Sequence, residues 1–338
     1  MQKNVNIFTI AVTVTLMAGL FIPIPSDATE LTVYSSRMEQ LIQPVFDAYT
    51  QTTGVSIKFI TDKDGPLLQR LSREGADSPA DIFMTVDAGA LWKAAHDNLL
   101  KPVSSPTLLV NIPPHLRDPQ HRWFGLSVRA RTLVFNTQKV KPALLTTYEA
   151  LGNPEWKNRI CLRTSKSVYN QSLVAMMIAE MGMAQTEKIV AGWVANLAID
   201  PAPDDTKLLE AIAAGICDVG IVNSYYYGRL IKKNPNLPLS LFWPNQKDRG
   251  VHVNVSGAGV VRSTKQASAA VKFLEWLSSK EAQNLFADVN FEYPVNAQVL
   301  PHRTVAKWGT FVQSKMNVGD AGRLQVEAIK LMDRVGYR

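Results

Sequence analysis

A run of three tyrosines, Tyr225 to Tyr227, is the stretch of the sequence best suited to binding chemistry. It follows directly on the apolar residues 218–222, which are predicted to form a strand. Ligands of open α/β sheets bind where the carboxyl end of a strand opens into a loop, so we expect the tyrosines in such a loop. Each phenol needs a polar partner, which suits a ligand site, but the rings could equally form an aromatic belt that packs two parts of the molecule together.

A second junction of the same kind lies at residues 161–172. It is rich in hydroxyl groups, among them Ser165, and it ends where a helix is predicted to begin. Hydroxyls beside a helix N-terminus suit an anion. An ordinary helix cap would explain the serines as well.

Strands and helices alternate along most of the chain, and this order must position the two junctions. Alternating β-branched runs and helical spacing of apolar residues predict the elements. The predicted strands are 31–34, 55–60, 81–85, 132–135, 160–162 and 218–222, and the predicted helices are 39–51, 66–74, 88–98, 171–181, 186–196, 206–214, 268–277 and 279–287. The alternation predicts an α/β fold with mainly parallel sheets.

The composition is that of an ordinary globular protein with a basic charge balance. The 338 residues are 46% apolar and carry a formal net charge of +7, which excludes a disordered chain. Lysines and arginines are scattered and form no cluster interleaved with aromatics, so we expect no nucleic-acid partner. A Gly-rich phosphate loop, a Gly-x-Ser-x-Gly elbow and a histidine pair at metal spacing are all missing from the sequence, so we expect no enzyme.

Residues 1–28 have the pattern of a secretory signal peptide. Lys3 is the only early charge, residues 7–24 are almost wholly apolar, and small residues precede a cleavage position after Ala28. An apolar run of this length could alternatively stay uncleaved as a membrane anchor. We predict cleavage and export.

Cys161 and Cys217 are the only two cysteines of the chain. An exported protein meets an oxidising compartment, where such a pair can form one disulfide. Each cysteine begins an apolar, strand-like run, so a bridge is geometrically possible if the strands are neighbours. Two buried free thiols are the alternative.

Five segments together are similar to a known family. They are residues 34–37 (Tyr-Ser-Ser-Arg), 78–89 (with Pro-Ala-Asp), 168–172, 223–226 (Asn-Ser-Tyr-Tyr) and 242–246. In this order, from about residue 31 to 300, the chain resembles the ferric-ion-binding solute-binding proteins of bacterial ABC importers. The resemblance implies a class II periplasmic-binding-protein fold, with two lobes, a hinge and an interlobe cleft.

The resemblance also implies where the lobes divide. With no long linker in the sequence, the chain must cross between lobes as ordered strands, near residues 127–135 and 257–261. We therefore expect an N-terminal lobe of residues 29–130 and 258–300 and a C-terminal lobe of residues 131–257 and 301–338.

Carried over by position, the family's metal ligands fall on three tyrosines. Tyr225 and Tyr226 match the paired tyrosine ligands, Tyr169 matches a tyrosine used by one branch, and Tyr227 falls outside the pair. Fe³⁺ prefers anionic oxygen and depresses the pKa of a bound phenol. Where that branch usually reads His-Tyr, this chain has Met38-Glu39. Glu39 could supply a carboxylate ligand, or it is only the first-turn acid of the next helix.

Three arginines are candidates for balancing the tyrosinate charge or for holding a synergistic anion such as carbonate. They are Arg37, Arg129 and Arg131, and guanidinium groups bind planar oxyanions at two points. Arg129 and Arg131 both lie on a predicted strand. Of the two we favour Arg131.

The resemblance implies a monomeric periplasmic protein that captures ferric iron by hinge closure and docks on the permease and ATPase of an ABC importer. The alternative is a binding protein of the same fold for another small ligand, such as an organic anion or a thiamine-like cation. The Met38-Glu39 departure favours this alternative, and the retained Tyr169, Tyr225 and Tyr226 oppose it.

Overall fold

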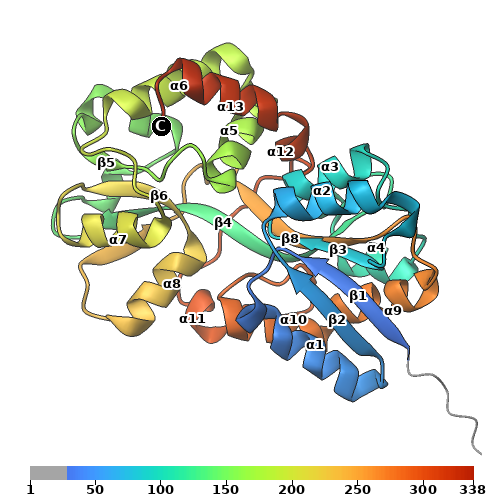
Figure 1. The fold of residues 1–338 in the computed structure, drawn as a ribbon. Helices are drawn as coiled ribbons and strands as arrows, with labels where there is room; N and C mark the ends of the chain where they lie inside the picture. Colours follow the sequence, from blue (N-terminus) through green and yellow to red (C-terminus); the bar gives the residue numbers. More distant parts are fainter. Residues whose placement is uncertain (1–28) are drawn as a thin grey trace, which may run out of the picture.

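The structure is a computed structural model that describes residues 29–338. The predicted signal peptide, residues 1–28, lies outside the described residues. Figure 1 shows two lobes side by side, each built on strands with helices packed around them. Within the described part, no helix is both long enough and apolar enough to span a membrane.

The described strands and helices follow the predicted alternation over most of the chain. The strands are β1 (Glu30–Ser35), β2 (Ser56–Thr61), β3 (Ile82–Thr85), β4 (Phe124–Asn136), β5 (Ile160–Cys161), β6 (Val219–Asn223), β7 (Leu239–Phe242) and β8 (Val253–Val260). The α-helices are α1 (Glu39–Thr53), α2 (Asp64–Glu74), α3 (Ala88–His96), α4 (Pro106–Asn111), α5 (Val168–Met181), α6 (Met183–Ala195), α7 (Asp205–Ala213), α8 (Ser224–Lys233), α9 (Ala267–Leu277), α10 (Lys280–Asn290), α11 (Arg303–Ala306), α12 (Asp320–Arg323) and α13 (Gln325–Arg334).

The strands form one hydrogen-bonded path in the order β2-β1-β3-β8-β4-β6-β5, with β7 paired to β4. On the N-terminal side β1 lies parallel to both β2 and β3. The carboxyl ends of these three strands therefore meet at one edge, the edge at which a ligand is expected. Buried apolar residues of this half form one continuous core.

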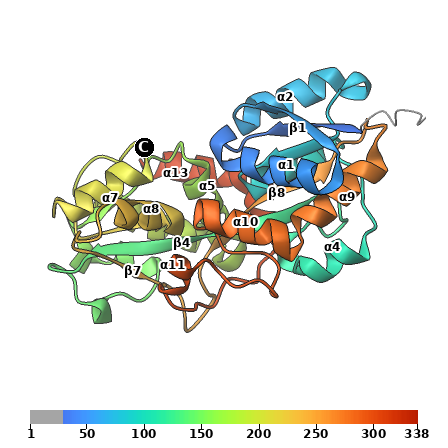
Figure 2. The same ribbon diagram turned by 90° about the horizontal axis from the view of Figure 1, so that it is seen from below.

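Strand β4 joins the two halves, and Figure 2 shows it extending across both. Up to Ala130 it pairs with β8, and from Arg131 onward it pairs with β6. All of its residues are buried. Because β8 pairs only with β3 and β4, we propose lobes that meet between residues 130 and 131 and between residues 252 and 253.

On the C-terminal side, β5 and β6 run parallel and are covalently joined. Cys161 at the end of β5 forms a disulfide with Cys217, which lies just before β6. The structure thus selects the bridge over two free thiols. In the register of the pair, Cys161 lies opposite Gly220, so the bridge ties together the strands that lead to the two predicted site junctions.

At both site junctions the structure has a helix where the sequence predicted a loop. The tyrosine run was expected in a loop, but α8 starts at Ser224 and includes all three tyrosines. The second helix was expected from residue 171, but α5 starts at Val168 and includes Tyr169. Tertiary packing overrides the weak helix propensity of tyrosine, so the candidate ligands stand on first helical turns.

The short helix α12 lies between the lobes. It packs against α3 of the N-terminal half and α5 of the C-terminal half, and Figure 1 shows it between them. The two helices approach closely: a Cβ added to Gly322 would lie 2.9 Å from the Cα of Gly89 and 2.6 Å from the Cβ of Trp92. The two backbones therefore touch at this glycine pair.

Candidate metal centre

Tyr169 is delivered by the β5–α5 connection. It is the second residue of α5 and is half-buried. Burial raises the pKa of its phenol, and the nearby Arg129 guanidinium and a hydrogen bond with Tyr225 oppose that rise. Burial disfavours the charged phenolate, whereas a neighbouring cation favours it. The Tyr169 phenol is therefore protonated near neutral pH but already stands in a positive environment.

The β6–α8 connection positions Tyr225 and Tyr226 in the first turn of α8. Their ring centroids lie 4.4 Å apart, and Tyr225 is only 5% exposed. Burial raises the pKa of Tyr225 well above its usual value, and the charges of Tyr169 and Tyr226 raise it further. Such mutual repulsion acts only between phenols that lie close together. The two connections therefore bring the three predicted tyrosines to one place.

Tyr227 points elsewhere. Its ring meets Trp308 edge-on at 5.8 Å between centroids, and its hydroxyl donates to the carbonyl oxygen of Leu239 at 3.5 Å. The aromatic packing that the sequence left open as an alternative thus applies to this tyrosine and leaves the preceding pair free for binding.

Three guanidinium groups surround the tyrosines. Arg129 and Arg163 lie over the Tyr169 ring, with 5.4 and 5.3 Å from their Cζ atoms to its centroid. The Arg229 guanidinium lies 4.9 Å from the centroid of Tyr225. Burial lowers the pKa of Arg163. The charges of Asp205 and Tyr226 and a hydrogen bond to Tyr226 outweigh that effect, so the pKa of Arg163 is raised. Arginines so close favour ionised phenols.

Arg131 lies two residues after Arg129 on β4 and has partners of its own. Its guanidinium donates 3.1 Å to Asp205 and 2.5 Å to Asn170. These bonds tie Arg131 beneath the tyrosine helices, whereas Arg129 lies against Tyr169. The geometry therefore favours Arg129 over Arg131 for charge balance, against the choice made from the sequence.

Arg37 and Ser165 already have partners in the protein. Arg37 forms a buried ion pair with Glu292, at 3.2 Å between Nη2 and Oε2, and donates to Ser127. The backbone N–H of Ser165 donates to the carbonyl oxygen of Arg338, and its carbonyl oxygen accepts from Gln171. An anion at Arg37 would compete with its ion pair, whereas the contacts of Ser165 use only its backbone groups.

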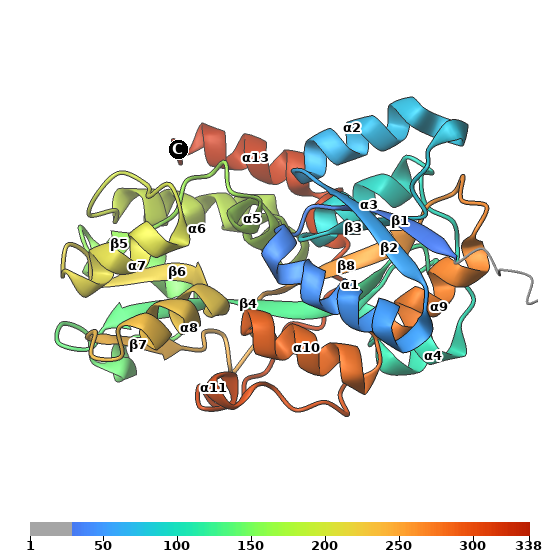
Figure 3. The same cartoon turned by 60° about the horizontal axis from the view of Figure 1, so that its bottom comes forward.

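Glu39 is exposed at the start of α1. Figure 3 shows that this end of α1 faces the other lobe. Met38, the N-cap, is 50% exposed and offers no side-chain cap to the helix. The position satisfies the role of a first-turn acid and leaves the Glu39 carboxylate free to reach a ligand from the N-terminal side.

The facing edge of the N-terminal lobe carries a buried carboxylate that sequence reasoning missed. We call Ser36, Asp64 and Val86, which follow β1, β2 and β3, the N-lobe edge. Burial raises the pKa of Asp64 to about 6, opposed by Ser36 and Arg129, and its Oδ1 is buried without a partner. Val86 accepts a hydrogen bond from Arg129. Arg129 therefore connects this edge to Tyr169.

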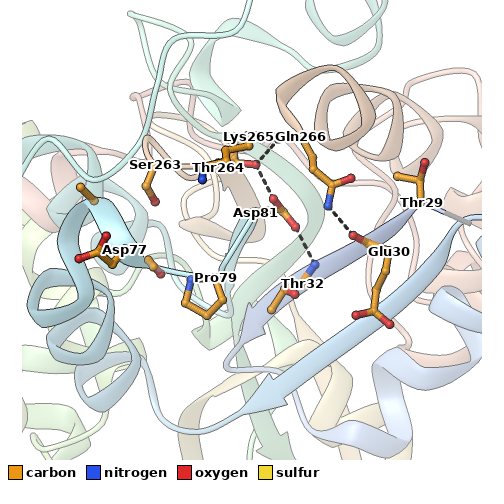
Figure 4. A pocket seen from close by; sticks show the side chains of 12 residues that line it. Thr29, Glu30, Thr32, Asp77, Pro79, Asp81, Ser263, Thr264, Lys265 and Gln266 are labelled. Carbon is orange, nitrogen blue, oxygen red and sulfur yellow. Dashed lines mark hydrogen bonds between the residues drawn. The ribbon is translucent and has the colours of Figure 1, made fainter. Parts of the chain in front are cut away.

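A polar hollow of about 700 Å³ opens at the opposite edge of the same strands. Figure 4 shows it between Thr29, Asp77 and Gln266, with the Asp81 carboxylate inside. Both oxygens of Asp81 are already used, one by the Thr32 N–H and one by the Thr264 hydroxyl. The hollow lies at the amino ends of β1 and β3, away from the edge where ligands of such sheets bind. It therefore adds nothing to the tyrosine site.

Two site residues, Arg163 and Arg229, had only weak signals in the sequence. Arg163 directly follows the strand ending at Cys161, and Arg229 stands one helical turn after Tyr225 and Tyr226. Positions three and four apart share a helix face, but this signal required knowing that the tyrosines are helical. Residues 29–338 contain no group of three or more His, Cys, Asp or Glu suited to a metal ion.

The chain is similar to known proteins. The family model for bacterial extracellular solute-binding proteins matches residues 77–310. Iron uptake protein A1 of Synechocystis sp. is 39% identical over 320 residues, covering 93% of this chain and 89% of that protein. The major ferric iron-binding protein of Neisseria meningitidis is 29% identical over 294 residues, covering 84% and 86%.

A solved structure has the same fold. The Trichodesmium IdiA (FutA) protein, in complex with iron and citrate ligands, matches with a TM-score of 0.88 and 44% sequence identity, covering 91% of this chain and 100% of that chain. The match confirms the predicted class II periplasmic-binding-protein fold. It also supports the prediction of a binding protein rather than an enzyme. The chain belongs to the family of bacterial extracellular solute-binding proteins.

Proposed function

We propose that the chain captures ferric iron through the phenolate oxygens of Tyr169, Tyr225 and Tyr226 and delivers it to an ABC importer. The observation that carries the proposal is the meeting of three phenols at the first turns of α5 and α8. Ferric ion prefers anionic oxygen and lowers the pKa of a bound phenol enough to displace its proton. The iron-binding relatives support the same cargo.

Charge balance at this site favours an anion beside the metal. Three phenolates cancel the charge of Fe³⁺, and the guanidiniums of Arg129, Arg163 and Arg229 lie beside them, with the Asp205 carboxylate 3.8 Å from Arg163. Guanidinium groups bind carboxylate or carbonate in two-point fashion. We therefore propose a synergistic oxyanion as co-ligand, with Glu39 as a further oxygen donor from the N-terminal lobe.

Export and delivery complete the proposal. Residues 1–28 direct the chain to the periplasm as a cleaved signal peptide, and the protein acts as a monomer. Iron that contacts both lobes stabilises the closed form. The permease and ATPase of the importer recognise that form, since hinge closure is the common switch of this architecture.

A second candidate function is the binding of an organic anion without metal. The cluster of three arginines favours it, and the same cluster disfavours a thiamine-like cation through repulsion. Calorimetric titration of the metal-free protein with citrate distinguishes the two functions. Tight binding of citrate alone would favour the anion function, whereas binding that requires iron favours iron capture.

The test is a visible absorption titration of the mature protein with chelated ferric iron. We expect a tyrosinate-to-iron charge-transfer band that Tyr225→Phe and Tyr226→Phe abolish or strongly weaken. Tyr227→Phe is the matched control, because this neighbouring ring packs on Trp308, and it should keep the band. If the folded wild-type protein shows no such band when competition from the chelator is controlled, iron capture is refuted.

A further inference from the structure

We propose that Arg131 is a positioning residue that fixes the spacing between Tyr169 and the Tyr225–Tyr226 pair. The inference rests on the proposed function, because it concerns the geometry of that ligand set. Arg131 is 2% exposed and lies on β4, behind the first turns of both tyrosine helices. Its guanidinium holds both turns at once.

On the α5 side the contact is through Asn170, the residue after Tyr169. The Asn170 Oδ1 accepts from Nη2 of Arg131 at 2.5 Å. The Asn170 amide nitrogen donates to the carbonyl oxygen of Arg163 and to the Tyr337 hydroxyl, both at 2.8 Å. The amide also donates to the carbonyl oxygen of Thr164 at 3.2 Å, so each of these hydrogen bonds goes to another protein group and together they hold the start of α5.

On the α8 side the contact is through Asn223, the N-cap residue two positions before Tyr225. Arg131 and Asn223 are direct partners in the β4–β6 ladder. The Asn223 Oδ1 lies 3.4 Å from Nη1 of Arg131, and its Nδ2 lies 3.4 Å from the Tyr225 hydroxyl oxygen. A shift of Arg131 is thus passed to the hydroxyl of a proposed ligand.

The charge of Arg131 is already matched inside the protein. Its Nη1 donates to Oδ2 of Asp205, the fully buried first residue of α7, at 3.1 Å. The same oxygen lies 3.4 Å from the backbone nitrogen of Asn223. This pairing separates Arg131 from Arg129: Arg131 organises the protein side of the site, and Arg129 faces the phenols.

A lysine cannot make these contacts. The planar guanidinium presents several donors in a fixed fork, while an ammonium is a compact point charge on a flexible stem. Partners that orient metal ligands are worth about 10- to 100-fold in metal affinity when removed. Arg131→Lys keeps the charge opposite Asp205 and loses the fork that spans Asn170 and Asn223.

The experiment measures ferric affinity by competition with citrate, and the wavelength of the charge-transfer band, for wild type, Arg131→Lys and Arg122→Lys. Arg122 pairs with Asp118 at 2.6 Å in the N-terminal half and controls for losing an arginine ion pair. We expect Arg131→Lys to bind iron about 10- to 100-fold more weakly and to shift the band. Arg122→Lys should change thermal stability but neither iron readout.

A second variant keeps the inference testable if Arg131→Lys does not fold. Asn223→Ser retains a good N-cap residue but loses the amide contacts to Arg131 and Tyr225, and it should also shift the band. Wild-type affinity and an unshifted band in the folded Arg131→Lys and Asn223→Ser proteins would overturn the inference alone. A wild-type protein without a band would overturn the proposed function, and the inference with it.

Discussion

The two lobes present opposite chemistry to each other. The C-terminal side offers three phenols with Arg163 and Arg229 beside them, on helices that follow disulfide-bridged strands and are held by Arg131. The N-terminal side offers the Asp64 carboxylate at the N-lobe edge and the exposed Glu39 at the start of α1. One side holds the proposed metal donors in a fixed arrangement, whereas the other offers one buried acid and one exposed acid.

This difference teaches that ligand recognition is unequally divided. A fixed donor set binds with little reorganisation, because its geometry is already that of the complex. The N-terminal side can then add closure without setting affinity. Met38-Glu39 at the position where the resemblance implies His-Tyr fits this proposed division, because the departure falls on the N-terminal side and the three tyrosines are kept.

The largest change in stability is expected from removing the disulfide of the C-terminal side. Cys161→Ala with Cys217→Ala removes the bridge between β5 and β6. For a sequence separation of 56 residues, the restored chain entropy predicts a loss of about 4 kcal/mol in the free energy of unfolding. Guanidinium chloride unfolding of the oxidised wild type and the variant measures it.

The single variant Cys161→Ala is the control, because it loses the same bridge. Single and double variants should be destabilised about equally. A double variant as stable as wild type would mean that the disulfide does not restrain the C-terminal side. The contrast between a rigid C-terminal side and a less restrained N-terminal side would then fail.

A smaller change in stability, this time an increase, is expected from substituting Asp64 at the N-lobe edge. The pKa of Asp64 is raised from 3.8 to about 6, so its contribution to stability is fully present below pH 3.8 and is lost as the pH rises through 6. Asp64→Asn removes a buried charge and should raise the free energy of unfolding at pH 7 by up to about 3 kcal/mol. Urea unfolding at pH 7 and at pH 5 measures both proteins.

Asp62→Asn is the matched control, because Asp62 is exposed on the same connection. It should change stability by less than about 0.5 kcal/mol. The stabilisation by Asp64→Asn should shrink at pH 5, where the wild-type carboxyl is largely protonated. A destabilised Asp64→Asn protein at pH 7 would instead show that the carboxylate is needed to pair Arg129.

The smallest effects are expected at the start of α1. Glu39→Gln should alter ferric affinity by less than about threefold, or 0.7 kcal/mol, because the exposed carboxylate adds to a donor set already in place. Restoring the family pattern with Met38→His and Glu39→Tyr should strengthen binding and enlarge the iron-induced compaction seen by small-angle scattering. Equal and large compaction in wild type and double variant would contradict the unequal division of recognition.

Most elements were accessible from sequence because their signals are local, and alternating apolar runs predicted them. The two-lobed fold and the three candidate phenols followed from the resemblance to the family. The choice between Arg129 and Arg131 was not accessible. Residues two apart share one face of a strand, so alternation does not separate them, and only the packing of α5 and α7 shows that Arg131 pairs with Asp205 while Arg129 lies against the Tyr169 ring.

Other residues were missed because their signal appears only after chain segments meet. Asp64 reads as an ordinary first-turn acid of α2, and its burial depends on Ser36, Val86 and Arg129, which come from three other segments. The disulfide stayed open for the same reason, since the β5–β6 pairing joins residues far apart in sequence.

The glycine contact between α3 and α12 restricts which residues these positions can hold. A Cβ on Gly322 would lie 2.9 Å from the Cα of Gly89 and 2.6 Å from the Cβ of Trp92, and a Cβ on Gly89 would lie 3.5 Å from the Cα of Gly322. Backbone that close leaves no room for a side chain, because packed interiors absorb little added volume. A larger residue at Gly322 would therefore push α12 away from α3 and change how the two halves rest against each other.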